Sequence, residues 1–170
     1  FAILGLGAGD GARYLTSRFP QVTVDVVEID PAMLDVAQRY FFFRTTPRLS
    51  VTLADARRFL VDREQTWDVI LADTYIGLSV PFHLATTEFF ALVEKRLAPG
   101  GVVVVNLAAT PQHPFARAIL RTLLTRFEHV LVVRTAGLGN HLVFAYDGAR
   151  PESALAAAAE RLDAEIGGAP

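Results

Sequence analysis

The chain has 170 residues, of which 52% are hydrophobic and 20% charged, and its formal net charge at pH 7 is -2. This length fits one domain with a full hydrophobic core, and this composition excludes an intrinsically disordered chain. The small negative charge offers no basic surface, so we do not expect nucleic acid as a partner.

A strand, a glycine turn and a helix are predicted at the start of the chain. The apolar residues 1–4 lead into glycines at alternate positions, and residues 10–19 have the composition of a helix. A residue without a Cβ enters positive φ cheaply, and a ligand can then lie against bare backbone. We therefore predict that Gly5, Gly7 and Gly9 form a ligand-binding turn. A tight connection without a ligand is the alternative.

The rest of the chain alternates between predicted strands and helices. Apolar and β-branched runs predict strands at residues 22–28, 49–54, 67–72, 102–106, 129–134 and 141–146. Helical spacing and capping residues predict helices at residues 31–40, 55–61, 86–97, 115–127 and 151–166. Such alternation with short connections implies an α/β fold, in which helices cover both faces of a mostly parallel sheet.

Acidic residues follow the carboxyl ends of four predicted strands. They are Asp10, Glu28, Asp55 and Asp73. Ligands of parallel sheets bind beyond these ends, so we expect the four side chains to converge on one rim. Glu28 stands roughly where a nucleotide-binding fold places the carboxylate that holds the ribose, and a solvated strand end is the alternative.

Asp10 narrows the class of ligand. Gly7-x-Gly9-x-x-Ala12 also fits a nicotinamide dinucleotide fingerprint, but a carboxylate would repel the pyrophosphate above the helix start. A nucleoside that carries a sulfonium and an amine suits Asp10 better. S-adenosylmethionine and its decarboxylated form are such nucleosides, and both offer a ribose to Glu28. The alternative for Asp10 is a helix N-cap.

Asp55 and Asp73 also have two interpretations each. Asp55 either caps the helix that follows it or accepts a hydrogen bond from an adenine amino group. Asp73 either stabilises the turn after its strand or acts in catalysis, which we predict because it begins a long loop at the rim. The four histidines share no metal-ligand spacing, so no metal is expected. The motifs of serine hydrolases and of P-loop nucleotide triphosphatases are absent.

Further features of the sequence concern the cellular location of the protein and the extent of its domain. The chain has no cysteine, which fits a reducing compartment and favours a cytoplasmic location. No apolar run is long enough to span a bilayer, so we expect no membrane contact by this segment. The chain begins without Met and inside a predicted strand, so we expect residues 1–170 to be one domain that lacks an upstream segment. Residues 41–43, three phenylalanines, are predicted to lie in the core or at an interface.

Four segments resemble one known family, the polyamine aminopropyltransferases or spermidine synthases. In order and spacing they are Gly7-Ala-Gly-Asp-Gly11, Val27-Glu-Ile-Asp-Pro31, Asp55-Ala-Arg-Arg-Phe-Leu60 and Trp67-Asp-Val-Ile-Leu-Ala-Asp73. The resemblance covers residues 1–105. It implies the Rossmann-like fold of class I S-adenosylmethionine-dependent methyltransferases, with a seven-stranded sheet.

The resemblance also implies a role for each acid. Glu28 would hold the ribose, Asp55 with its neighbour Ala56 the adenine, and Asp10 the aminopropyl amine of decarboxylated S-adenosylmethionine. Asp73 would be the base that takes a proton from a small-molecule amine. An alkylamine with a pKa of about 10 is protonated at neutral pH, so removing that proton creates the nucleophile. A homodimer is plausible by the same resemblance.

The sequence departs from the family at the amine site. Asp73-Thr-Tyr-Ile76 replaces the family's Asp-x-x-Asp, and Thr135–Asn140 stands near the place of its later Pro-Thr-Tyr segment. The family's small amino-terminal β domain is not within the sequence. Two alternatives to aminopropyl transfer therefore stay open. One is an S-adenosylmethionine-dependent methyltransferase in which Asp73 or Tyr75 steers a small acceptor, and the other is a non-catalytic nucleoside-binding module.

Overall fold

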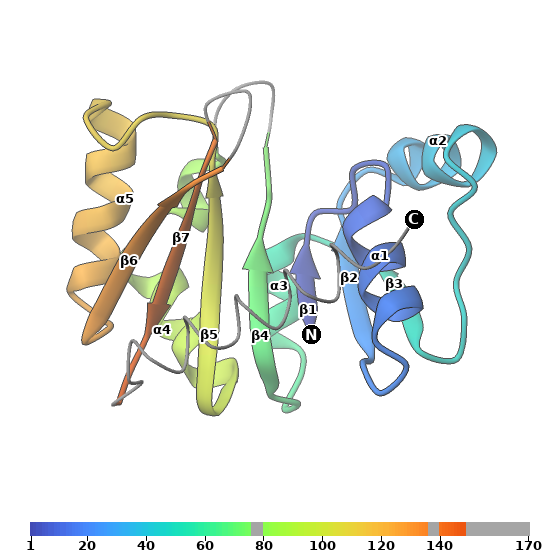
Figure 1. Cartoon of the computed structure of the whole chain (residues 1–170), viewed down its shortest axis with the longest axis horizontal. Coiled ribbons are helices and arrows are strands. Elements are labelled where there is room, and N and C mark those ends of the chain that lie inside the picture. Colours follow the sequence, from blue (N-terminus) through green and yellow to red (C-terminus); the bar gives the residue numbers. More distant parts are fainter. Residues whose placement is uncertain (76–79, 136–139, 149–170) are drawn as a thin grey trace, which may run out of the picture.

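A seven-stranded sheet forms the centre of the protein (Figure 1). The computed structural model describes residues 1–75, 80–135 and 140–148. The strands are β1 (Ala2–Leu4), β2 (Val24–Glu28), β3 (Leu49–Leu53), β4 (Trp67–Ala72), β5 (Leu97–Leu107), β6 (His129–Arg134) and β7 (His141–Tyr146). Their order is β3-β2-β1-β4-β5-β7-β6, with β1 to β5 parallel and β7 antiparallel to both β5 and β6. The predicted mostly parallel, seven-stranded sheet is confirmed.

Helices cover both faces of this sheet. They are α1 (Asp10–Arg18), α2 (Pro31–Tyr40), α3 (Ala56–Val61), α4 (Thr87–Arg96) and α5 (Pro114–Leu124), with a short 3-10 helix, η1 (Phe82–Leu84). Ala2 and Leu4 of β1 share a core cluster with buried residues of α3, α4 and α5, whereas Ile3 shares another with Ala12 of α1 and Ala37 of α2. Because successive strand residues point to opposite faces, the two sets of helices lie on opposite sides.

The fifth strand begins earlier than predicted. The helix before it ends at Arg96, and β5 starts at Leu97 instead of Val102. Trp67 pairs with Leu97 and Val69 with Val102, so residues 98–101 bulge between these partners. The Pro-Gly-Gly sequence at residues 99–101, between the predicted helix and the predicted strand, is therefore part of a bulge inside β5. The helix predicted over residues 151–166 lies outside the described residues.

The glycine turn after β1 has a different reason for each of its first three glycines. A Cβ on Gly5 would lie 2.3 Å from the Asp73 carbonyl oxygen, so this glycine lets the end of β4 approach β1. A Cβ on Gly9 would lie 2.3 Å from the ring of Phe43, which is fully buried. A Cβ on Gly7 would meet nothing within 4 Å. Packing therefore accounts for Gly5 and Gly9, while no atom packs where a side chain of residue 7 would lie, so the backbone of Gly7 is open.

We expect Gly5→Ala to destabilise the fold far more than Gly7→Ala. Both glycines have positive φ, which costs an alanine about 1–2 kcal/mol. Only at Gly5 does the new methyl also collide with main chain, which cannot move aside as a side chain can. We expect a total loss of about 3 kcal/mol or more, to be measured by urea unfolding. Equal losses for the two variants would show that this close approach carries no strain.

The predicted aromatic segment divides between core and surface. Phe43 is fully buried, as the core prediction requires, but Phe42 is 78% exposed and Phe41 is 44% exposed. Phe42 also has a positive φ of 58°. The backbone here turns sharply, which directs one ring inward and leaves the other two on the surface.

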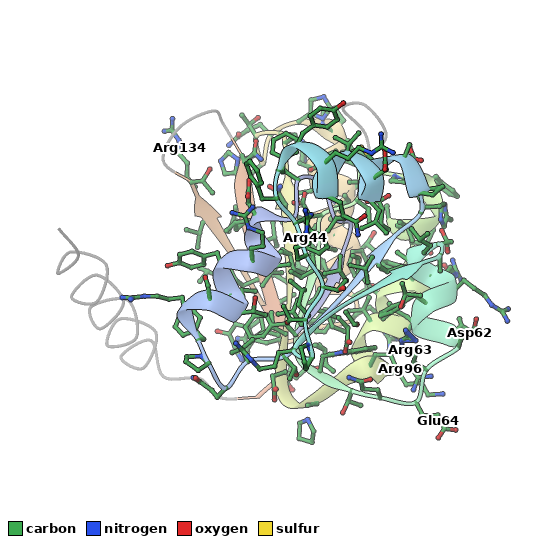
Figure 2. The ribbon with its side chains drawn as sticks, turned by 90° about the vertical axis from the view of Figure 1, so that its right-hand side faces the viewer. Arg44, Asp62, Arg63, Glu64, Arg96 and Arg134 are labelled. Carbon is green, nitrogen blue, oxygen red and sulfur yellow. The ribbon has the colours of Figure 1, made fainter. Side chains whose placement is uncertain are left out.

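Charged side chains from the end of α3, from the residues that follow it and from α4 lie close together. Figure 2 shows Asp62, Arg63 and Arg96 among them. The Arg63 guanidinium lies 4.1 Å from the centroid of the Phe59 ring, and Arg96 Nε donates to the Leu60 carbonyl oxygen at 2.9 Å. These contacts fasten α3 to its surroundings.

Within the described residues, no helix is long and apolar enough to cross a membrane.

Candidate active site

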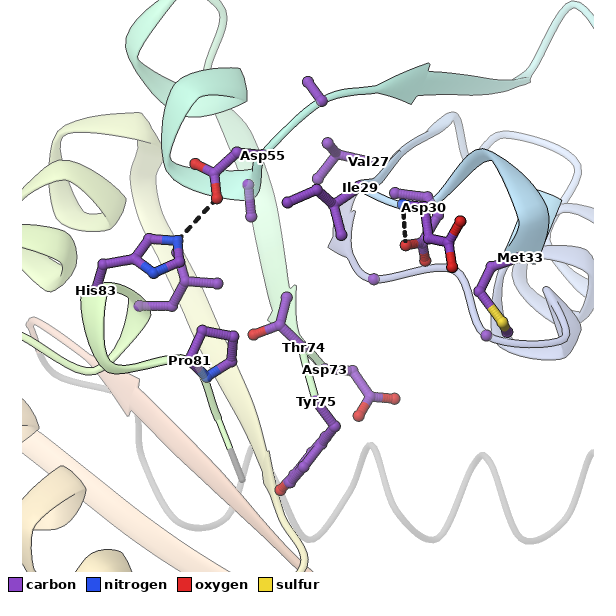
Figure 3. Close-up of a pocket in the computed structure, with 16 residues that line it drawn as sticks. Val27, Ile29, Asp30, Met33, Asp55, Asp73, Thr74, Tyr75, Pro81 and His83 are labelled. Atoms are coloured by element: carbon purple, nitrogen blue, oxygen red, sulfur yellow. Dashed lines mark hydrogen bonds and ion pairs between the residues drawn. The ribbon is translucent and has the colours of Figure 1, made fainter. Parts of the chain in front are cut away.

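A pocket of about 530 Å³ lies beyond the carboxyl ends of β1, β2 and β4 (Figure 3). This volume is in the range of small-molecule sites. Seven predicted site residues line it: Gly5, Gly7, Glu28, Asp55, Ala56, Asp73 and Tyr75. Further lining residues that the sequence analysis did not select include Ile29, Asp30, Met33, Thr74, Pro81 and His83. The strand ends thus bring together residues from positions far apart in the chain.

Glu28 braces the glycine turn. Its Oε2 accepts a hydrogen bond from Leu6 N at 3.0 Å, and its Oε1 accepts one from Asp30 N at 2.9 Å. Glu28 is only 9% exposed, so the alternative of a solvated strand end is wrong. Each carboxylate oxygen can accept a further hydrogen bond. The side chain can therefore hold the turn and still receive hydroxyl groups from a ligand.

Asp55 has a partner on each oxygen. Its Oδ1 accepts a hydrogen bond from Arg58 N at 2.9 Å and so caps α3, and its Oδ2 lies 2.8 Å from Nε2 of His83 (Figure 3). The capping interpretation is confirmed. An adenine amino group would have to share Oδ2 with His83 or displace it. Sequence reasoning missed His83 because it tested the histidines only for metal-ligand spacing.

Asp55 should stabilise the fold in a pH-dependent way. Burial opposes its ionisation, but the Arg58 amide and His83 outweigh burial and hold the Asp55 pKa below its usual 3.8. Its stabilising effect is therefore complete above pH 3.8 and is lost as the pH falls through the lowered pKa. We expect Asp55→Ala to cost about 1 kcal/mol at pH 7, and the difference from wild type to shrink in acid.

Urea unfolding between pH 3 and pH 7 measures this difference. Thr86→Ala made in a Glu88→Gln background, and compared with Glu88→Gln alone, is the matched control. Thr86 caps α4 through its uncharged hydroxyl, to which Phe89 N donates at 3.2 Å, and Glu88→Gln removes the carboxylate whose pKa a Thr86 hydrogen bond lowers. In this background the loss from Thr86→Ala should not vary with pH. A pH-independent loss for Asp55→Ala as well would contradict an ionised cap at Asp55.

Asp73 lies at the other end of the pocket, with Tyr75 (Figure 3). Asp73 N donates to the Leu4 carbonyl oxygen at 2.9 Å, which fixes its main chain beside β1. Its Oδ1 accepts a hydrogen bond from Asn106 Nδ2 at 2.8 Å. Among the described residues, none donates to Oδ2 and no backbone N–H donates to this carboxylate. Asp73 therefore offers a free oxygen to a ligand, and the turn-stabilising alternative has no support in this part of the chain.

Tyr75 is held by the main chain of the neighbouring strand. Its hydroxyl donates to the Asn106 carbonyl oxygen at 2.6 Å and accepts from Ala108 N at 2.7 Å. Burial and the charge of Asp73 raise the pKa of Tyr75, although the Ala108 hydrogen bond partly opposes them. The hydroxyl is thus neutral and occupied. The structure supports Tyr75 as a fixed wall of the pocket more than as a proton carrier.

Two predicted ligand-binding residues, Gly9 and Asp10, do not line this pocket. Asp10 is exposed, its Oδ1 lies 3.8 Å from Nη1 of Arg13, and it borders a separate hollow. Asp10 is not the N-cap either, because Gly9 holds that position and Asp10 is the first residue of α1. The expected convergence of four acids is therefore seen for three only. The turn carries Asp10 past the rim before the helix begins.

Among residues 1–75, 80–135 and 140–148, no three histidine or acidic side chains are grouped closely enough to hold a metal ion. The polar groups of the pocket instead suit an uncharged sugar and base at one end and a cation at the other. Glu28 and Asp55 offer acceptors to hydroxyl and amino groups, and Asp73 offers a carboxylate oxygen to an ammonium group.

Comparison with known proteins agrees with this architecture. The family model described as the spermine/spermidine synthase domain matches residues 2–135. A probable polyamine aminopropyl transferase of Bifidobacterium longum is 40% identical over 105 residues, which are 62% of this chain and 23% of that protein. The residues that the family model matches include the glycine turn and all three acids of the pocket.

Methyltransferases are similar as well. The human eEF1A lysine and N-terminal methyltransferase is 30% identical over 166 residues, which are 91% of this chain and 23% of that protein. The crystal structure of human methyltransferase-like protein 13 in complex with SAH has a TM-score of 0.78 and 28% identity, over 86% of this chain and 71% of that one. The chain thus spans 23% of the length of both curated relatives.

Proposed function

Because the chain belongs to the spermine/spermidine synthase family, we propose that it transfers an aminopropyl group from a sulfonium nucleoside to an amine, with Asp73 as the base. The observation that carries the proposal is the carboxylate of Asp73. The carboxylate is held at one oxygen by Asn106, and among the described residues none donates a hydrogen bond to the other oxygen. Glu28 and Asp55 line the same pocket.

The nucleoside binds across the strand ends in this proposal. Glu28 accepts the ribose hydroxyls, and Asp55 with Ala56 receives the adenine beside His83. These assignments place the sulfonium near the open backbone of Gly7, between the ribose site and Asp73. Decarboxylated S-adenosylmethionine is the co-substrate, in keeping with the family.

The transfer needs one proton movement. Asp73 takes a proton from the ammonium group of the acceptor, which frees the nitrogen lone pair. The nitrogen attacks the aminopropyl carbon bound to sulfur, the carbon–sulfur bond breaks, and its electron pair neutralises the sulfonium. The products are an alkylated amine and methylthioadenosine. Asp73 supplies both the base and the orientation of the nucleophile.

Methyl transfer to an amine is the second candidate. Two observations favour it. Asp10, the residue expected to bind the aminopropyl amine, does not line the pocket, and a human methyltransferase is similar over 91% of the chain. The same carboxylate serves both reactions, because both require a deprotonated amine. Only the group on sulfur differs.

Calorimetric titration of the full-length protein with S-adenosylmethionine, its decarboxylated form and methylthioadenosine tests the proposal. We expect tighter binding of the decarboxylated ligand, and transfer of its aminopropyl group when a diamine is added. Tighter binding of S-adenosylmethionine would instead favour methyl transfer. Binding of none of the three would overturn the nucleoside site. The Asp10→Asn variant shows whether Asp10 contributes to the preference.

A further inference from the structure

A chain of side-chain hydrogen bonds leads away from Asp73 across two strands. Asn106 Nδ2 donates to Asp73 Oδ1 at 2.8 Å, and Asn140 Nδ2 donates to Asn106 Oδ1 at 3.1 Å. Asn106 belongs to β5, and Asn140 directly precedes β7, which pairs with β5 beside it. Neither asparagine lines the pocket. The two amides therefore stand behind Asp73 and not beside the ligand.

The direction of this chain suits an ionised Asp73. An ionised carboxylate only accepts hydrogen bonds, so Asn106 must present its NH₂ group to it. Its amide oxygen then faces Asn140, whose NH₂ group donates to it. If the side-chain amide of Asn106 were rotated by 180°, its oxygen would face the carboxylate oxygen of Asp73. Its NH₂ group would then face the NH₂ group of Asn140. Asp73 and Asn140 thus favour the same orientation of the Asn106 amide.

Both asparagines are anchored through their main chains. The carbonyl oxygen of Asn106 accepts the hydroxyl of Tyr75 at 2.6 Å. The carbonyl oxygen of Asn140 accepts from the backbone N and from Oγ1 of Thr135, at 3.1 and 2.9 Å. An exposed aspartate at a strand end is otherwise free to rotate about two side-chain bonds. Here the hydrogen bond from Asn106, whose main chain is anchored, restricts that rotation.

From this geometry we infer that Asn106, oriented by Asn140, is the positioning residue that holds Asp73 Oδ1 and so directs Oδ2 at the acceptor amine. The inference rests on the proposed role of Asp73 as the base. Displacement of a reacting group by about 1 Å can cost about 100-fold in rate. A loosened Asp73 should therefore slow transfer without weakening nucleoside binding.

Kinetics of two variants test the consequence for catalysis. Asn106→Leu keeps the shape and removes the donor, and Asn140→Ala leaves Asn106 in place but frees its amide to rotate. We expect kcat to fall about 10- to 100-fold for Asn106→Leu and less for Asn140→Ala, with the nucleoside dissociation constant unchanged within about twofold. Unchanged kcat in both variants would overturn the inference.

Gln65→Leu is the matched control. Gln65 Nε2 donates to Asp25 Oδ2 at 2.9 Å, which is the same kind of amide–carboxylate bond, and neither residue lines the pocket. Its kcat should equal that of wild type. Asn106→Asp adds a readout that a merely structural role would not change. A second carboxylate beside Asp73 would have to share a proton with it, so the acid limb of the pH–rate profile should move to higher pH.

Nuclear magnetic resonance separates this inference from the proposed function. If Asn106 donates to Asp73, the chemical shifts of its side-chain amide protons should change when Asp73 is protonated in a pH titration. They should not change in this way in Asp73→Asn. This result does not depend on turnover. Amide proton signals of Asn106 that do not change when Asp73 is protonated would overturn the contact. If these signals do change but the protein transfers no group, only the proposed function is overturned.

Discussion

Asp73→Asn is expected to slow group transfer strongly and to leave nucleoside binding intact. Asparagine keeps the size of the side chain, and its oxygen can still accept the hydrogen bond from Asn106. It cannot take a proton from the acceptor ammonium. General base catalysis contributes about 10²- to 10⁴-fold, so we expect kcat to fall by that factor. Steady-state kinetics with the amine, together with calorimetry for the nucleoside, measures the two effects separately.

Asp68→Asn is the control for this substitution. Asp68 is an exposed acid of β4, the strand that Asp73 directly follows, and it does not line the pocket. It should have wild-type kcat. Comparable turnover by Asp73→Asn would rule out Asp73 as the base. If even the wild-type protein binds the nucleoside but transfers nothing to any amine, the substitution should change only stability, as expected of a non-catalytic binding module.

The sequence predicted the pocket through one rule, that ligands bind beyond the carboxyl ends of parallel strands. Glu28, Asp55 and Asp73 lie within two residues of a strand end, and all three line the pocket. Asp10 failed the same rule because β1 ends at Leu4, and a turn separates them. The rule therefore holds for residues directly after a strand and weakens once a loop redirects the chain.

The order of the strands was beyond the reach of the sequence. Asp73 lies beside the glycine turn because β4 pairs with β1, and it meets Asn106 because β5 pairs with β4. Asn106 ends the predicted strand over residues 102–106, so a polar residue at this place was visible in advance. His83 gave no such signal, because it reaches Asp55 from the short helix η1, whose position depends on tertiary packing.

Glu28→Gln is expected to weaken nucleoside binding and the fold together. The carboxylate accepts hydrogen bonds from Leu6 N and Asp30 N on its two oxygens. A glutamine has only one oxygen, so its NH₂ group must face one of these N–H groups at a site that is 9% exposed. A buried, unsatisfied donor costs about 1–3 kcal/mol, which corresponds to roughly 5-fold to 150-fold in an equilibrium constant.

The division of this cost between folding and nucleoside binding shows what Glu28 does. If the side chain binds the ribose as well as bracing the turn, the nucleoside dissociation constant should rise about tenfold or more, beyond the effect on urea unfolding. Glu128→Gln is the matched control, because Glu128 accepts Gly148 N at 2.9 Å on the surface and does not line the pocket. It should leave binding unchanged. A loss of stability in Glu28→Gln with wild-type affinity would mean that Glu28 only braces the turn, and the nucleoside would then have to hold its ribose elsewhere.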